Sequence, residues 1–179
     1  NKNFKLYKKD YNHLPKKFFD NFEFIVDLVN ISNDAASELN PKFTNHTNYL
    51  NKLKLYEKIQ NNKNVLRYIY MSSCSVYGNN KNLISERSKP KPISLYSKLC
   101  LKYEKYLKKR NKISFTIMRL GTLYGWSERM RYDIAINKIM RDMIFLKKIE
   151  ILGGTQLRFF CHNKFACNVI SQIIMENNK

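Results

Sequence analysis

A run of hydroxyl side chains closes a strand-like segment of this chain, in the sequence Met71-Ser72-Ser73-Cys74-Ser75-Val76-Tyr77-Gly78. The residues just before it, 65–70, are mostly apolar or aromatic, which is typical of a buried strand. Tyr96 follows this segment at the start of a pattern that predicts a helix. In open α/β sheets, ligands bind at the carboxyl ends of the strands. We therefore expect Ser73 and Tyr96 to face one pocket.

The length and composition favour a globular protein. The chain has 179 residues, of which 44% are hydrophobic, enough for one domain with a sizeable core. No apolar run approaches the roughly 20 residues of a membrane-spanning helix. No charged-then-apolar signal segment opens the sequence either. We expect no membrane partner.

The net charge of +19 invites comparison with nucleic-acid-binding proteins. The basic residues are scattered along the chain, and only residues 89–91 and 108–110 form local clusters. No recognition motif accompanies the charge. A composition rich in Lys, Asn, Ile, Tyr and Phe is also typical of a proteome with A/T-rich codons. A nucleic-acid partner therefore remains an alternative that rests on charge alone.

The cysteines predict no metal site and no disulfide framework. Cys74, Cys100, Cys161 and Cys167 form no C-x-x-C pair and show no zinc-ligand spacing. The simplest interpretation is that they are small buried hydrophobic residues in a reducing compartment. This interpretation predicts a cytoplasmic protein.

Segments with strand and helix patterns alternate along the chain, which predicts a parallel sheet covered by helices. Asn40-Pro41 marks a turn or a helix entry, and Ser94 is a candidate N-cap. The segments expected as strands are residues 22–29, 65–72, 113–120 and 149–152. Those expected as helices are residues 47–60, 94–110, 133–146 and 165–175.

Four segments in a fixed order resemble a known family. They are residues 72–78, Pro92-Ile93-Ser94-Leu95-Tyr96-Ser97-Lys98, Arg119-Leu120-Gly121-Thr122-Leu123-Tyr124-Gly125 and Arg129-Met130-Arg131-Tyr132-Asp133. Together they resemble the extended short-chain dehydrogenases/reductases, in particular the NAD-dependent nucleotide-sugar epimerases and dehydratases. The resemblance runs from about residue 7 to residue 174.

The resemblance implies a fold and a division into domains. The fold is α/β, with a Rossmann-like parallel sheet and helices on both faces. The amino-terminal part is expected to be missing, and the carboxyl-terminal part is a small portion of the substrate domain. The implied division is a partial NAD-binding domain over residues 1–132 and a partial substrate-binding portion over residues 133–179.

The resemblance also implies catalytic roles for two residues. Tyr96 would be the general acid/base, and Ser73 would orient the substrate oxygen. Transient hydride transfer at an alcohol carbon requires a proton to move on or off the adjacent oxygen. A phenol can move this proton if its pKa is brought down towards the working pH.

Further residues are expected, by the same resemblance, to bind NAD or a nucleotide-sugar substrate. Arg131 and Arg158 fall where the family binds the phosphates of the nucleotide sugar, a role that suits the forked donors of a guanidinium. A solvated or ion-paired surface arginine is the alternative. The resemblance also allows a homodimer. The expected NAD contacts are Asp10, Leu28, Val29, Asn30, Asn48, Leu120, Gly121 and Thr122.

Two departures from the family pattern bear on activity. No glycine precedes Gly78, so the phosphate-cradling glycine loop, in which backbone N–H groups approach a pyrophosphate, is not in this sequence. The family's active-site lysine, four residues after the tyrosine, is replaced by Cys100. Lys98 is expected on the opposite helix face and Lys102 off the face of Tyr96.

Two functions therefore remain open. One is an NAD-dependent epimerase or dehydratase that acts on a nucleotide sugar. The other is a catalytically impaired remnant, or a binding module, that keeps the fold without the chemistry.

Overall fold

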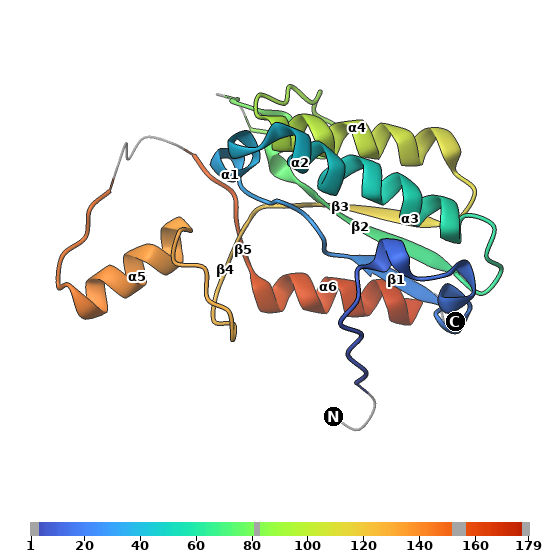
Figure 1. Cartoon of the computed structure of the whole chain (residues 1–179). Coiled ribbons are helices and arrows are strands. Elements are labelled where there is room, and N and C mark those ends of the chain that lie inside the picture. Colours follow the sequence, from blue (N-terminus) through green and yellow to red (C-terminus); the bar gives the residue numbers. More distant parts are fainter. Residues whose placement is uncertain (1–3, 81–82, 152–156, 177–179) are drawn as a thin grey trace. The chain divides into compact units, whose positions relative to one another are not determined.

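The computed structural model describes residues 4–80, 83–151 and 157–176. The chain forms two compact units, Asn1–Met118 and Arg119–Lys179, whose elements are drawn in Figure 1. Each unit is described by itself. The division expected at residues 132 and 133 separates a cofactor-binding from a substrate-binding part. It concerns binding roles and stays a prediction.

A three-stranded sheet forms the centre of the first unit. Its strands lie in the order β1-β2-β3, and β1 is parallel to β2, with Asp27 opposite Tyr70. The carboxyl ends of β1 and β2 therefore lie at the same edge of the sheet. The bounds are Phe24–Asp27 for β1, Arg67–Ser73 for β2 and Phe115–Leu120 for β3. The expected strands at residues 22–29, 65–72 and 113–120 are confirmed in shorter or shifted form.

The helices of the first unit begin at residues that cap them. Ser94 accepts a hydrogen bond from the Ser97 N–H at the start of α4 (Leu95–Arg110), as predicted, and left-handed Asn111 ends this helix. Asn40 caps α2 (Pro41–Asn45), which continues through a π-helical turn, η3 (His46–Leu50), into α3 (Asn51–Ile59). The sequence patterns did not predict the short elements α1 (Asp34–Leu39), η1 (Tyr11–His13), η2 (Lys16–Asn21) and η4 (Cys74–Tyr77).

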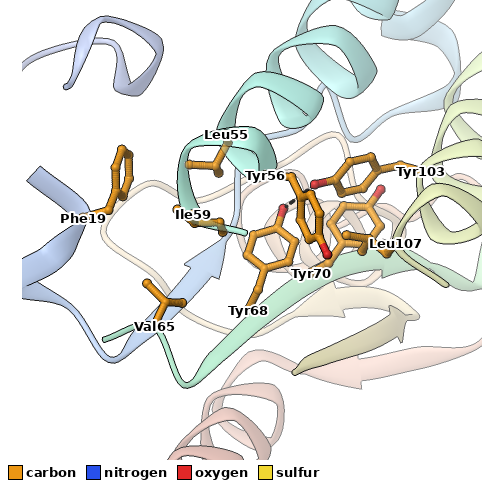
Figure 2. Close-up of a cluster of buried hydrophobic side chains, with 9 residues drawn as sticks. All are labelled: Phe19, Leu55, Tyr56, Ile59, Val65, Tyr68, Tyr70, Tyr103 and Leu107. Atoms are coloured by element: carbon orange, nitrogen blue, oxygen red, sulfur yellow. Dashed lines mark hydrogen bonds between the residues drawn. The ribbon is translucent and has the colours of Figure 1, made fainter. Parts of the chain in front are cut away.

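The core of this unit is rich in tyrosine (Figure 2). Tyr68 and Tyr70 point from one face of β2 towards Tyr103 of α4, and the Tyr70 and Tyr103 ring centroids lie 4.8 Å apart. Each buried aromatic ring contributes a large apolar area to the core. The complete cluster comprises Phe19, Leu55, Tyr56, Ile59, Val65, Tyr68, Tyr70, Tyr103 and Leu107.

Helices α3 and α4 cover one face of the sheet in this unit (Figure 1). The other face of β2 carries Ile69 and Met71, which are also buried. The alternation of side chains along a strand places these residues opposite the tyrosines. Both faces of β2 are therefore covered. The α/β architecture with parallel strands is confirmed.

The second unit contains a pair of parallel strands, β4 (Thr122–Tyr124) and β5 (Phe160–His162). The expected helices appear as α5 (Ala135–Phe145) and α6 (Asn163–Glu176). The strand expected at residues 149–152 is wrong over residues 149–151, while Leu152 lies outside the described residues. Ile149 and Ile151 are exposed, because β4 pairs with β5 and leaves their apolar pattern without a neighbouring strand.

The structure also bears on what the sequence predicted about the cysteines and about membrane-spanning helices. None of the four cysteines forms a disulfide bond in the described part of the chain; only Cys100 is buried, and Cys167 is exposed. The interpretation of all four as buried residues is therefore wrong, since the helix that carries Cys167 turns this side chain to solvent. Within the described ranges, each helix is too short or too polar to cross a bilayer.

Candidate functional site

Ser73 and Tyr96 come together at the carboxyl end of β2. Ser73 is the last residue of the strand, and its Oγ accepts a hydrogen bond from the Ser75 N–H at 3.1 Å, which begins the short helix η4. Tyr96 lies in the first turn of α4. Both side chains are largely buried. The Ser73 side chain lies close enough to the Tyr96 phenol to lower the pKa of Tyr96 by hydrogen bonding. The expected roles of the two residues in one pocket stay predictions.

The environment of Tyr96 favours the protonated phenol. Burial raises the pKa of Tyr96, the neighbouring Cys100 raises it further, and the hydrogen bond with Ser73 lowers it. The Asp34 carboxylate adds to the increase, because a nearby negative charge disfavours a phenolate. At neutral pH, Tyr96 is therefore equipped to donate a hydrogen bond rather than to accept a proton.

Cys100 lies one helical turn after Tyr96 and packs in the same buried cluster, with Val76 and Tyr77. Its side chain is fully buried, and burial raises the pKa of the thiol to about 11. A neutral thiol brings no positive charge to the phenol. Lys98 is exposed, whereas Tyr96 is buried. The exposed Lys102 lies with its ammonium 4.0 Å from the centre of the Tyr49 ring.

Two carboxylates of α1 hold the start of α4. The Glu38 Oε1 atom accepts a hydrogen bond from the Leu95 N–H at 2.9 Å, and the Ser94 hydroxyl donates to Asp34. Negative charge at a helix N-terminus is favoured by the unpaired N–H groups and the helix dipole. These contacts fix the turn that carries Tyr96. Sequence reasoning missed both residues, which lie about 60 positions earlier in the chain.

Three of the residues expected to contact a cofactor, Leu28, Val29 and Asn30, lie in the segment that follows β1. Leu28 and Val29 are 68% and 44% exposed, so both present apolar surface next to the strand end. The Asn30 side chain donates to the Met71 carbonyl at 3.1 Å. Asn48 is buried, and its amide accepts from the Ile31 N–H at 2.8 Å and donates to the Ile31 carbonyl at 3.1 Å. Asn48 therefore fixes this segment.

Asp10 has a local structural role in the described contacts. Its carboxylate caps η1 and accepts hydrogen bonds from the backbone and side chain of Asn12, at 2.8 and 2.9 Å. The backbone hydrogen bond lowers the pKa of Asp10. The expected contact of Asp10 with a cofactor stays a prediction.

The remaining expected site residues belong to the second unit. Gly121 lies next to Phe159, and a Cβ at this position would come within 2.6 Å of the Phe159 carbonyl oxygen, so close approach requires glycine. Arg131 is paired with Asp133, and Arg158 is exposed. Leu120 ends β3, and Thr122 begins β4. The binding roles of these five residues stay predictions.

A buried ion pair lies close to this site and was not predicted. The Lys52 ammonium of α3 is 2.7 Å from an Asp27 carboxylate oxygen at the end of β1, and both side chains are almost completely buried. Lys52 shares the buried face of α3 with Leu55, Tyr56 and Ile59. A lysine at an apolar helix position, together with an aspartate inside a strand pattern, was the available signal.

The sequence also matches proteins of known family. Residues 7–179 match the profile of the NAD dependent epimerase/dehydratase family. A Bacillus subtilis (strain 168) protein described as an uncharacterized UDP-glucose epimerase, YtcB, is 31% identical over 103 residues. This stretch covers 53% of the present chain and 31% of the relative.

Solved structures show the same fold. The UDP-glucuronic acid 4-epimerase from Bacillus cereus, in complex with UDP-glucuronic acid and NAD, matches with a TM-score of 0.74 and 26% identity over 88% of this chain and 51% of that one. The UDP-glucose 4-epimerase from Thermotoga maritima, with UDP-glucose, matches with a TM-score of 0.82 and 21% identity, over 96% and 60% of the two chains. The second likeness supports the fold alone.

The chain therefore spans about half the length of the solved relatives and a third of the curated one. The family profile nevertheless covers nearly all of it, including the Ser73 and Tyr96 segments. This match and the Rossmann-like arrangement agree with each other. The chain belongs to the NAD-dependent epimerase/dehydratase family.

Proposed function

We propose that this chain acts on a nucleotide sugar through transient, NAD-dependent hydride transfer, as an epimerase or a dehydratase. The observation that carries the proposal is the contact between the Ser73 hydroxyl and the Tyr96 phenol at the carboxyl end of β2. Ser73 would hold the sugar oxygen, and Tyr96 would exchange its proton. When bound, NAD would supply reversible acceptance of a hydride from the adjacent carbon.

The residues after β1 fit a dinucleotide in part. Leu28 and Val29 present apolar side chains, and the Asn30 side-chain oxygen is buried without a hydrogen-bond partner among the described residues. A hydrogen-bond donor at this oxygen would satisfy it, as a buried polar atom requires. The glycine loop that would hold a pyrophosphate is not in this sequence. We therefore assign the ring portions of NAD, rather than its phosphates, to the strand end.

On the substrate side, Arg131 and Arg158 are the candidate phosphate ligands. The Arg131 guanidinium already pairs with Asp133, through an Nε–Oδ1 hydrogen bond of 3.1 Å. Phosphate binding by Arg131 would exchange one anionic partner for another, so its net gain is small. Arg158 is exposed and makes the stronger candidate.

A second candidate function is a binding module without turnover. The observation that favours it is the neutral, fully buried Cys100 beside the phenol. Without a cation, Tyr96 remains protonated at neutral pH and serves best as a hydrogen-bond donor to a bound hydroxyl. This alternative keeps the same site residues and the same ligands.

One experiment separates the two candidates. NAD and a UDP-sugar are titrated against the purified chain by calorimetry, and product formation is followed in the same samples. Binding with turnover that is lost in Tyr96→Phe supports the enzyme. Binding without turnover supports the module, and absence of binding by both ligands overturns both candidates. Arg158→Ala and Ser73→Ala separate phosphate binding from sugar positioning.

A further inference from the structure

One ion pair holds both backbone polar groups of Val29, its N–H and its carbonyl. The Val29 N–H donates to Asp27 Oδ1 at 3.1 Å, and the Val29 carbonyl accepts from Lys52 Nζ at 2.6 Å. The other carboxylate oxygen, Asp27 Oδ2, lies 2.7 Å from the same Nζ. Val29 lies two residues beyond the end of β1, so side chains hold it where the strand pairing has stopped.

Tyrosines surround this ion pair and satisfy its remaining contacts. The Tyr68 hydroxyl donates to Asp27 Oδ2 at 2.6 Å. The single proton of the Tyr103 hydroxyl is shared between two acceptors, the Lys52 carbonyl oxygen at 3.1 Å and the Tyr68 oxygen at 3.2 Å. Figure 2 shows Tyr68 and Tyr103 side by side. The Lys52 ammonium also lies 5.2 Å from the centre of the Tyr70 ring. Burial lowers the pKa of Lys52, and the Asp27 carboxylate opposes this effect. A buried charge requires such partners.

The next residues are held in the same manner. The Asn48 amide contacts both the N–H and the carbonyl of Ile31, and the Asn30 side chain binds the Met71 carbonyl of β2. Three consecutive residues are therefore fixed by buried or half-buried side chains. Hydrogen bonds to charged groups are stronger than those between neutral groups, so the Val29 peptide is held most firmly.

We propose that Asp27 and Lys52 are positioning residues that hold the Val29 peptide, and with it the exposed Leu28 and Val29 side chains, in place for the ring portions of a dinucleotide. This role rests on the proposed function. The ion pair does not touch the ligand. It sets the direction of a backbone segment that the sheet no longer holds.

The test is the double variant Asp27→Asn/Lys52→Met, because removal of one partner alone would leave an uncompensated buried charge. The double variant replaces the charged acceptor of the Val29 N–H by a weaker neutral one and removes the donor to the Val29 carbonyl. Tyr103→Phe is the matched control. It removes the shared Tyr103 hydroxyl donor from the same network and leaves both Val29 contacts intact.

The first readout is hydrogen exchange at the Val29 amide, measured by NMR and compared with amides that exchange by global unfolding. We expect the exchange rate of the Val29 amide to increase about tenfold in the double variant, because a hydrogen bond to a charged group is lost. In Tyr103→Phe, we expect no increase beyond that caused by global unfolding. Ile31, held by Asn48, should keep its protection. Unchanged exchange at Val29 would overturn the inference, whether or not the protein binds NAD.

The second readout is NAD affinity by calorimetry. We expect roughly tenfold weaker binding in the double variant and wild-type affinity in Tyr103→Phe. Equal affinities in the double variant and the wild type would overturn the positioning role. If the wild type does not bind NAD, the proposed function fails. The exchange rate of the Val29 amide still tests whether Asp27 and Lys52 hold the Val29 backbone.

The wild-type protein supplies a measurement for the case in which the double variant does not fold. The Lys52 ammonium should give a ¹⁵Nζ signal with slowly exchanging protons and a coupling to the Val29 carbonyl carbon. Rapidly exchanging ammonium protons at neutral pH would contradict a buried contact to this carbonyl.

Discussion

The Cys100 thiol lies against the Tyr96 phenol, one turn further along α4. The thiol is fully buried and neutral at physiological pH, since burial raises its pKa to about 11. It therefore offers no positive charge to stabilise a phenolate. Burial and Asp34 act in the same direction and raise the pKa of Tyr96. The contact between Cys100 and Tyr96 explains how this site can retain the family's tyrosine and still favour the protonated phenol.

Catalysis by Tyr96 should increase with pH. Below the raised pKa of the phenol, its ionised fraction grows about tenfold per pH unit. We expect kcat/KM, measured with NAD and a UDP-sugar, to rise by about the same factor per pH unit between about pH 7 and pH 9. This range stays below the pH at which tyrosines ionise in the unfolded chain. Tyr96→Phe is the control and should show no such increase. A pH-independent rate in the wild type would contradict the proton-transfer role.

Replacement of Cys100 by lysine should lower the pKa of Tyr96. A cation about 4 Å from the phenol contributes about 4 kcal/mol at an effective dielectric constant of ~20, or roughly three pKa units. We therefore expect faster turnover at neutral pH in Cys100→Lys, and no increase in the control Cys100→Met. An unchanged rate would count against the electrostatic explanation.

The same replacement should reduce stability. The Lys52 ammonium is close enough to Cys100 to interact with it electrostatically, so a second ammonium would be repelled in the buried interior. We expect a lower urea midpoint for Cys100→Lys than for Cys100→Met. Equal midpoints would indicate that the two positions do not interact.

The tyrosine core should make the protein sensitive to alkali. Burial raises the pKa of Tyr68, Tyr70, Tyr96 and Tyr103 above the ordinary value of 10.0. Above about pH 10, the unfolded chain loses phenol protons that the folded chain retains, so the free energy of unfolding falls as pH rises. Each such phenol contributes up to about 1.4 kcal/mol per pH unit in this range.

Urea titrations at a series of pH values will measure this effect. The lowered pKa of Lys52 acts in the opposite direction, since stability gains as pH rises towards its ordinary value of 10.5. Tyr103→Phe should show a smaller loss of stability above pH 10 than the wild type. A flat profile would contradict the burial of these phenols.

Glu38 should stabilise the turn that carries Tyr96. Its carboxylate accepts the Leu95 N–H, which has no partner within the helix. We expect Glu38→Ala to lose about 1 kcal/mol of stability and to speed amide exchange at Leu95. Glu38→Gln keeps an acceptor and should retain most of the protection. Equal exchange in the alanine variant and the wild type would exclude this capping contact.

Local patterns predicted the elements that carry the candidate site. Ser94 is a good N-cap, and Leu95, Leu99, Tyr103 and Leu107 recur on one face, so α4 was predictable almost to its ends. The apolar run before Ser73 predicted β2 equally well. Parallel strands end at one edge of a sheet, and from this rule we expected Ser73 and Tyr96 to face the same region.

Short elements escaped prediction because their formation depends on a partner. The residues of β4 and β5 form three-residue strands, too short to show a period, and each is a strand because the other lies beside it. Residues 149–151 have a strand-like composition and no pairing strand. Residues 149–151 therefore do not form the expected strand, because a strand also requires a pairing partner.

The amino-acid sequence by itself determined which residues form β2 and α4, and that Tyr96 and Cys100 share a helix face, because these depend on periodicity and capping within a few residues. Only the tertiary structure decided that Lys52 meets Asp27, 25 residues away, and that both lie buried beneath the end of β1. A buried charge is stable only with specific partners around it, and the residues of this network come from four separate elements, β1, β2, α3 and α4. No local pattern encodes that meeting.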